Sequence, residues 1–165
     1  MNIPKLACAA FAAFSTGAAA IGGLADLTVY DRSEGRNLPV YWHEGRAWVV
    51  GKPGNEYQLN LRNRQGEDLL AVLSVDGVNA VSGETASWNQ TGYVLGPYHG
   101  FDIKGWRKNL ERVAAFFFTE HQNSYAARTG RPDNVGVVGV AVGVPLAVVF
   151  LTQQSNNATV KVGVK

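Results

Sequence analysis

The feature that most constrains this chain is the segment Leu69–Val75, an unbroken run of apolar and small residues that ends directly at Asp76-Gly77. Because the run contains no alternation with charged residues, it is typical of a β-strand buried on both faces. Asp and Gly both tolerate the positive φ of a tight turn, so the strand is expected to end there. A strand this apolar needs a second layer of structure over it, which favours a fold of two packed layers.

Further strands are expected before this segment. Residues 56–62 alternate between apolar and polar side chains, which predicts a strand with one dry and one wet face. The short polar connection 64–68 leads from that strand into Leu69–Val75, so the two are predicted to be antiparallel neighbours. Residues 38–42 and 46–50 flank a loop with a late Gly45 and are predicted to form a hairpin.

Two elements are expected after the central strand. Residues 113–119 include Phe116-Phe117-Phe118 and are predicted to form a buried strand, since aromatic side chains suit a pleated surface. Residues 124–129 are predicted to form a short helix, begun by Ser124 and stopped by Gly130.

Taken together, these patterns predict a single all-β domain over residues 26–165. At 165 residues the chain is long enough to bury a core without disulfides. Only 17% of its residues are charged, and 19 are glycine, as expected of a β-rich chain with many turns. We expect two antiparallel sheets packed face to face in a jelly-roll-like sandwich of eight to ten strands with one short helix.

Residues 1–25 have the composition of a secretory signal peptide. Lys5 precedes an uncharged run of small and apolar residues, and small residues occur where a peptidase could cleave. Cleavage after Ala25 is preferred and cleavage after Ala20 is the alternative. Since Cys8 lies inside this leader, the mature chain would have no cysteine, and the protein would be periplasmic or extracellular.

The uncharged segment 135–151 allows two interpretations. It is near the length of a transmembrane helix, but it contains several glycines and Pro145. We therefore predict two buried strands, 135–142 and 146–151, and no stable membrane span. Residues 158–164 are predicted to form a last strand at a sheet edge, with Lys161 and Lys165 as charges that oppose edge pairing.

Charge gives no indication of a nucleic-acid partner. The formal net charge is +2, and the two signs are interspersed along the chain. This distribution lacks the electrostatic footprint that binding to nucleic acid or to an anionic membrane requires.

An ordered series of short motifs carries a resemblance. It comprises Ser74-Val75-Asp76-Gly77, Ser82-Gly83, Gly92-Tyr93 with Pro97, Ile103 with Gly105-Trp106-Arg107, Ala115-Phe116, Ser124-Tyr125-Ala126, Gly130, and Asn134-Val135-Gly136 with Gly139. Between residues 55 and 142, this series resembles a family of short, secreted, uncharacterised bacterial proteins. The resemblance implies a bacterial envelope or extracellular setting and a compact β-rich domain. It carries over no catalytic residue and no cofactor, and the stretch after Val142 departs from the family's pattern.

No set of catalytic or metal-binding residues can be recognised from the sequence. His43, His99 and His121 are spaced too widely to suggest a metal motif. Ser74 and Ser124 do not lie in a Gly-x-Ser-x-Gly sequence. The acids are numerous, but none forms a defined pair for glycoside hydrolysis, and Asp before Gly is typical of a turn. We therefore expect no catalytic residues, no metal and no cofactor.

Aromatic residues beside polar ones are the better indication of function. A sugar ring stacks its C–H face on an aromatic ring while neighbouring polar groups bind its hydroxyls. On this pattern we predict a ligand-binding surface among six residues. They are Trp88, Asn89, Tyr98, His99, Trp106 and Arg107. For Trp106 a role as a buried anchor is the stronger interpretation, and Arg107 could pair with a carboxylate.

Two functions remain open from the sequence. The first is a secreted, non-enzymatic β-sandwich module for binding or assembly at the bacterial envelope or outside the cell. It would have a glycan or protein partner, or would self-assemble through an edge strand in 135–151 or 158–164. The alternative is a small secreted hydrolase acting on glycans, which requires acids or histidines that converge in a cleft.

Overall fold

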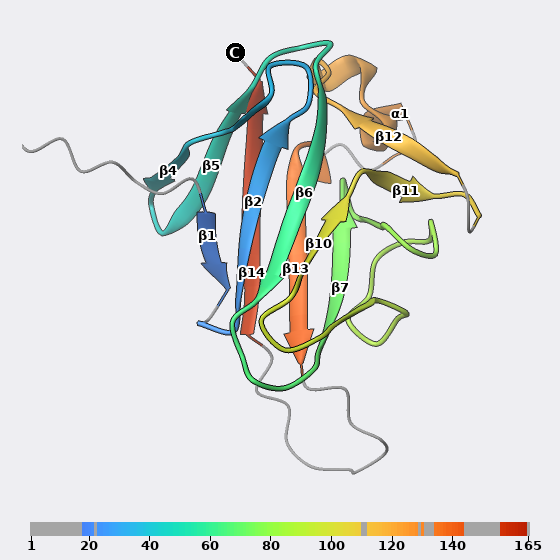
Figure 1. The fold of residues 1–165 in the computed structure, drawn as a ribbon. Coiled ribbons are helices and arrows are strands. Elements are labelled where there is room, and N and C mark those ends of the chain that lie inside the picture. Colours follow the sequence, from blue (N-terminus) through green and yellow to red (C-terminus); the bar gives the residue numbers. More distant parts are fainter. Residues whose placement is uncertain are drawn as a thin grey trace, which may run out of the picture.

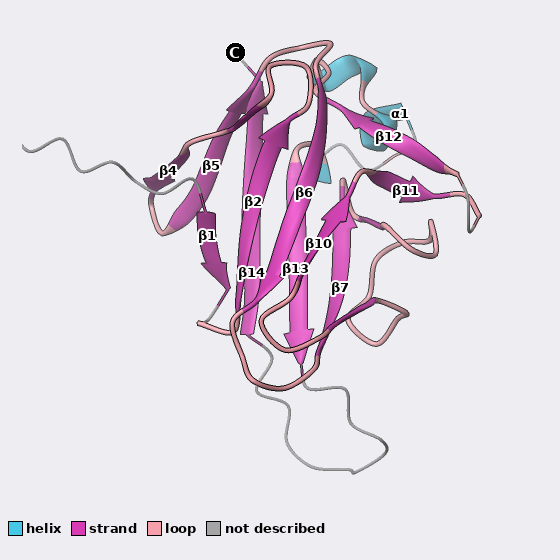
Figure 2. Ribbon diagram, viewed as in Figure 1, coloured by secondary structure: helices cyan, strands magenta, loops and turns pink. Residues whose placement is uncertain are grey.

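The computed structural model describes residues 18–21, 23–109, 112–128, 130, 134–143 and 156–164. Within them the regular secondary structure is almost entirely β-strand, with two short helical segments (Figures 1 and 2). The strands are β1 (Ala18–Ile21), β2 (Ala25–Asp31), β3 (Arg36–Asn37), β4 (Val40–His43), β5 (Arg46–Gly51), β6 (Glu56–Asn63), β7 (Leu69–Val75), β8 (Val78–Asn79), β9 (Tyr93–Leu95), β10 (Gly100–Ile103), β11 (Gly105–Arg107), β12 (Val113–Phe117), β13 (Val137–Gly143) and β14 (Asn156–Val164). The helical segments are η1 (His121–Asn123) and α1 (Tyr125–Arg128). The predicted all-β class is confirmed, but the predicted eight to ten strands are too few, because several strands have only two to four residues.

The strands form two sheets. The first has the order β1-β2-β6-β12-β11, with β10 also paired to β6 and β3 to β2. The second has the order β4-β5-β14-β13-β7-β8, with β9 also paired to β7. In Figure 1, β2 and β6 of the first sheet lie in front of β14 and β13 of the second. Most pairs are antiparallel, but β14 and β5 are parallel, and the jelly-roll connectivity that we predicted is not confirmed.

A single hydrophobic core lies between the sheets. The alternating residues Tyr57, Leu59 and Leu61 of β6 are buried in it, as the sequence pattern predicts. On β7, Leu69 and Leu73 face the same core, while Val72 is buried on the opposite face. The prediction that β7 is buried on both faces holds fully for the core face only, because on the other face Val72 is buried while Leu70 and Ser74 are partly exposed.

The prediction that β6 and β7 are antiparallel neighbours is wrong. β6 lies in the first sheet and β7 in the second, so the connection 64–68 crosses from one layer to the other. Asn63, which is fully buried, fixes this corner: its Nδ2 donates to the carbonyls of Glu67, Leu95 and Gly96, at 2.7–3.1 Å. Apolar alternation shows which face of a strand points inward, but it is equally satisfied by a neighbour in the same sheet and by one in the facing sheet.

The prediction of a last strand at the sheet edge is also wrong. β14 lies inside the second sheet, between β5 and β13. β13 is interior as well, so the two segments predicted to offer edges for strand addition are both paired on each side. The edge of this sheet beyond β5 is instead the short strand β4.

Parts of two predictions fall outside the described residues. These are residues 1–17 of the predicted leader and the strand expected at 146–151. In the uncharged segment 135–151, residues Val137–Gly143 form strand β13. None of the helices formed by the described residues has the length and the apolar composition that crossing a bilayer requires.

The tight turn predicted at Asp76-Gly77 is present, and both residues have positive φ. The hairpin predicted around Gly45 is also present, but its loop has two residues, Glu44 and Gly45, and not the three expected, because His43 pairs with Arg46. Near the predicted helix 124–129, Ser124 Oγ accepts a hydrogen bond from Ala127 N at 3.1 Å, which caps α1.

The strand predicted at 113–119 is shorter and less buried than expected. β12 ends at Phe117, and Val113 and Phe117 are both exposed, whereas Phe116 and the following Phe118 are buried. The aromatic run therefore alternates between the core and solvent.

Candidate functional site

The six residues predicted to bind a ligand lie in three separate places. Trp88 and Asn89 belong to the loop between β8 and β9, Tyr98 and His99 to the turn between β9 and β10, and the last two residues to β11. In Figure 1, β11 lies on the side of the molecule opposite β4 and β5, whereas the turn that leads into β10 lies at the lower end of the sandwich.

The loop that carries Trp88 is held by hydrogen bonds from a buried side chain. The buried Asn79 donates from Nδ2 to Gln90 Oε1 at 3.0 Å and to the Thr91 carbonyl at 3.1 Å. Ser87 Oγ donates to Asn89 Oδ1 at 2.6 Å. On this anchored loop the Trp88 side chain is 58% exposed.

The Tyr98 turn lies at the other end of β7. Tyr98 adopts φ +56°, its N–H donates to the Gln65 carbonyl at 3.1 Å, and its side chain is 63% exposed. His99 Nδ1 pairs with the Pro97 carbonyl at 2.8 Å. This turn follows β9, whose Leu95 pairs with Leu69, whereas Asn79 of the Trp88 loop pairs with Ser74. The structure therefore does not bring Trp88 and Tyr98 into one site.

Trp106 is held by packing. It lies partly buried against the core, edge-on to Phe116 with ring centroids 4.6 Å apart and planes at 81°. Gly105 before it is buried and lies directly against the backbone of Ala114 on β12. Trp106 is thus an anchor for β11, which agrees with the anchoring role favoured from the sequence over a role in ligand binding.

Arg107, in contrast, belongs to a contiguous surface. Its guanidinium carbon lies 5.6 Å from the centre of the Tyr93 ring, a cation–π geometry. The Tyr93 ring in turn contacts Phe101, with centroids 5.5 Å apart and planes at 38°. We call Phe101, Tyr93 and Arg107 the flank row, because they come from β10, β9 and β11 on one side of the sandwich.

The flank row combines a buried support with two exposed groups. Tyr93 is only 8% exposed, whereas Phe101 is 49% exposed and Arg107 is also exposed. Burial raises the pKa of the Tyr93 hydroxyl, and the nearby Arg107 charge partly opposes that rise. Tyr93 therefore stays neutral and orients the half-exposed ring and the cation on either side of it.

Sequence reasoning missed Tyr93 and Phe101 as site residues. Both were visible as aromatic residues close to strand ends, but β9 belongs to one sheet and β10 to the other. Only the packing of the two sheets brings the three side chains together.

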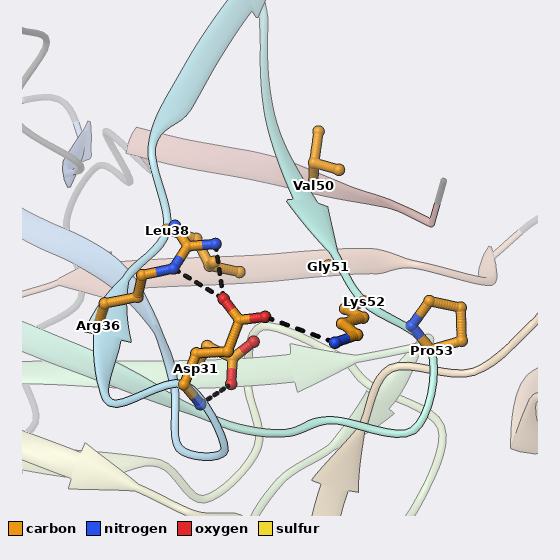
Figure 3. Close-up of a pocket in the computed structure, with 8 residues that line it drawn as sticks. Asp31, Arg36, Leu38, Val50, Gly51, Lys52 and Pro53 are labelled. Atoms are coloured by element: carbon orange, nitrogen blue, oxygen red, sulfur yellow. Dashed lines mark hydrogen bonds and ion pairs between the residues drawn. The ribbon is translucent and has the colours of Figure 1, made fainter.

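A pocket lined by several charged residues lies at one end of the sandwich (Figure 3). It measures about 190 Å³ and lies between the end of β2, β3 and the end of β5. Its charges are engaged with one another: Glu34 pairs with Arg36 at 2.7 Å and lies 4.0 Å from Lys52. Asp31 accepts hydrogen bonds from Glu34 N and Asn55 Nδ2, each at 2.8 Å. These contacts stabilise the turn 31–35, and we assign the pocket a structural role.

Two of the short sequence motifs, Ser74-Val75-Asp76-Gly77 and Asn134-Val135-Gly136 with Gly139, meet around Asp76. Its Oδ1 accepts a hydrogen bond from Gly136 N at 2.8 Å, and Gly77 lies against the Asn134 side chain. Ser74 Oγ lies 3.4 Å from the Gly139 carbonyl, to which it donates. These residues form a structural junction between β7 and the start of β13.

Asp76 also has an altered acidity. Burial raises the pKa of its carboxyl above the usual 3.8, and the hydrogen bond from Gly136 opposes the rise. The pKa of the Tyr57 hydroxyl is raised mainly by burial and to a smaller extent by the negative charge of Asp76. No group of three or more residues able to hold a metal ion occurs in the described part of the chain.

Comparison of the chain with models of known protein families, with curated proteins and with solved structures finds no match.

Proposed function

We propose that this protein is a secreted, non-enzymatic binding module of the bacterial envelope or extracellular space, and that it binds glycans through the flank row. The observation that carries the proposal is the half-exposed Phe101 ring held beside an exposed Arg107 by the buried Tyr93. The proposed secreted setting is supported by the leader-like composition of residues 1–25 and by the sequence resemblance described above.

The chemistry of the row suits a sugar. A pyranose ring presents a C–H face that packs on an aromatic ring, and its hydroxyls accept hydrogen bonds from a guanidinium. Because the Tyr93 support fixes both neighbours, little side-chain freedom is lost on binding, which favours affinity.

Affinity electrophoresis in gels that contain a soluble polysaccharide tests the proposal. The protein should be retarded by at least one polymer of a panel, and Phe101→Ala should weaken the retardation about tenfold, since aromatic contacts of this kind dominate binding surfaces. Trp42→Ala is the matched control, because Trp42 is an exposed aromatic residue on β4, at the opposite edge of the second sheet. Equal retardation of the two variants would refute the role of the flank row.

The hydrolase alternative is tested in the same samples. Release of new reducing ends from a retarding polymer would show catalysis and overturn the non-enzymatic assignment. If the polymer retards the protein and no new reducing ends are released, the result supports a non-enzymatic binding function.

Assembly through a strand edge is a second candidate function. It is favoured by β4, an edge strand that exposes Tyr41 and Trp42. Light scattering after size exclusion, at several concentrations, tests it: Trp42→Lys should abolish any concentration-dependent growth in mass, and a monomer at all concentrations contradicts assembly.

A further inference from the structure

We propose that the glycan bound at the flank row is acidic and that Arg107 receives one of its carboxylates. This inference rests on the proposed function, because it names the ligand class of the same surface. It depends on three observations: the position of Arg107, the absence of a carboxylate paired with it among the described residues, and the charge of the hairpin that carries it.

The position of Arg107 is fixed by its backbone and by Tyr93. Its N–H donates to the Ala80 carbonyl at 2.8 Å, and the residue pairs with Val113 on β12. The Tyr93 ring contacts the guanidinium, and the side chain remains exposed. A guanidinium held in this way keeps N–H groups free for a planar, two-point contact with a carboxylate.

The structure provides no carboxylate for that contact among the described residues. Arg32, Arg36 and Arg64 pair with Glu56, Glu34 and Asp26, respectively, but no ion pair of the described residues includes Arg107. The expectation from the sequence that Arg107 could bridge a carboxylate of this chain is therefore not met within the described part. An anion from outside would complete its hydrogen bonding.

The hairpin of β11 and β12 concentrates positive charge. Between residues 104 and 112 the sequence has four basic residues and one acidic residue, a local excess greater than the formal net charge of +2 of the whole chain. The four basic residues are Lys104, Arg107, Lys108 and Arg112, and all four are exposed. This local field attracts a polyanion to the side where Phe101 is exposed.

The neighbouring Phe101 favours an acidic sugar over other anions. Its exposed ring offers an apolar surface beside the cation, and a uronic acid unit presents a C–H face and a carboxylate together. A simple polyelectrolyte would use the charges of the hairpin without requiring the ring.

The test compares two polymers with the same backbone. Polygalacturonic acid is one, and its carboxyl-reduced form, in which each carboxylate has become a hydroxymethyl group, is the other. We expect the protein to bind the acidic form at least tenfold more tightly, and Arg107→Gln to lower that affinity about tenfold, because a charge-assisted contact is lost. Arg112→Gln is the matched control, since it removes one charge from the same hairpin. It should lower the affinity less than threefold, because an exposed charge without a direct contact is screened by solvent and salt.

Each outcome has a distinct meaning. Equal binding of the two polymers overturns the acidic ligand while leaving a glycan-binding module, whereas binding of neither, nor of the wider panel, overturns the proposed function itself. Equal losses in Arg107→Gln and Arg112→Gln, with dextran sulfate binding as tightly as polygalacturonate, would show general polyanion attraction and refute a specific carboxylate contact. Arg107→Lys separates charge from geometry: it keeps the charge but should recover only part of the affinity, and its thermal midpoint reports whether the fold is intact.

Discussion

Gly105 is the position where a single methyl group should disturb both the fold and the flank row. A Cβ at this position would lie 2.6 Å from the carbonyl carbon of Ala114, and closer still to its oxygen. No flexible side chain can move away to make room, because the obstacle is the backbone of the neighbouring strand. Gly105→Ala therefore forces β11 and β12 apart, and Arg107 moves with β11.

The expected loss of stability follows from this geometry. Overpacking of a tight contact costs about 1–3 kcal/mol, and a backbone obstacle places Gly105→Ala near the upper end. Replacing glycine also restricts the unfolded chain, which offsets about 0.4–1 kcal/mol. We expect a net loss of about 2 kcal/mol, which for a chain of this size lowers the melting temperature by roughly 4–8 °C.

Differential scanning calorimetry measures the effect against Gly143→Ala. Gly143 lies at the exposed end of β13 without positive φ, and a Cβ there would meet no atom within 4 Å. Its substitution should change stability by less than about 0.5 kcal/mol. If both variants melt at the same temperature, the close approach of Gly105 to β12 is refuted, and with it the placement of Arg107.

Three further predictions concern other parts of the chain. Asn63→Ala leaves the carbonyls at the corner between the sheets without their shared donor and should lower the free energy of unfolding by about 2–3 kcal/mol in urea titrations; a loss below about 0.5 kcal/mol would contradict the corner. For Asp76, the raised folded pKa means that the charged carboxylate lowers stability above that pKa and that the penalty disappears as the pH falls below 3.8, so Asp76→Asn should melt higher than the parent at pH 7 and converge with it near that lower pH. The reasoning is contradicted if the two melting temperatures are equal at pH 7, or if the difference between them grows as the pH falls. Finally, a chain that begins at Asp26 lacks the fully buried Ala25 and should melt lower than one that begins at Ile21; equal melting would show that the residues before Asp26 do not contribute to the fold.

Local sequence was sufficient for individual strands and turns. The alternation in β6 correctly identified its buried side chains, and Asp76-Gly77 correctly marked the turn after β7. Steric limits on φ and the two-residue period of a strand act within a few residues, so they can be read directly from the chain.

Only one of the three flank-row residues, Arg107, was predicted from the sequence. The pairing of a cation with nearby aromatic residues suggested Arg107, but its partners Tyr93 and Phe101 come from strands of different sheets. Trp106, equally prominent in the sequence, packs against the core. Exposure depends on the residues that cover a side chain, and these are distant in sequence.

The sequence by itself determined the all-β class, the faces that strands such as β6 turn to the core, and the positions of the tight turns, because these depend on hydrophobic periodicity and local backbone sterics. Only the tertiary structure decided that β6 and β7 lie in different sheets, that β14 is interior, and that Phe101, Tyr93 and Arg107 form one surface. The physical reason is that a strand's apolar face requires burial but does not specify the partner that buries it. That choice is made by the corner at Asn63 and by the packing of the two sheets on one core.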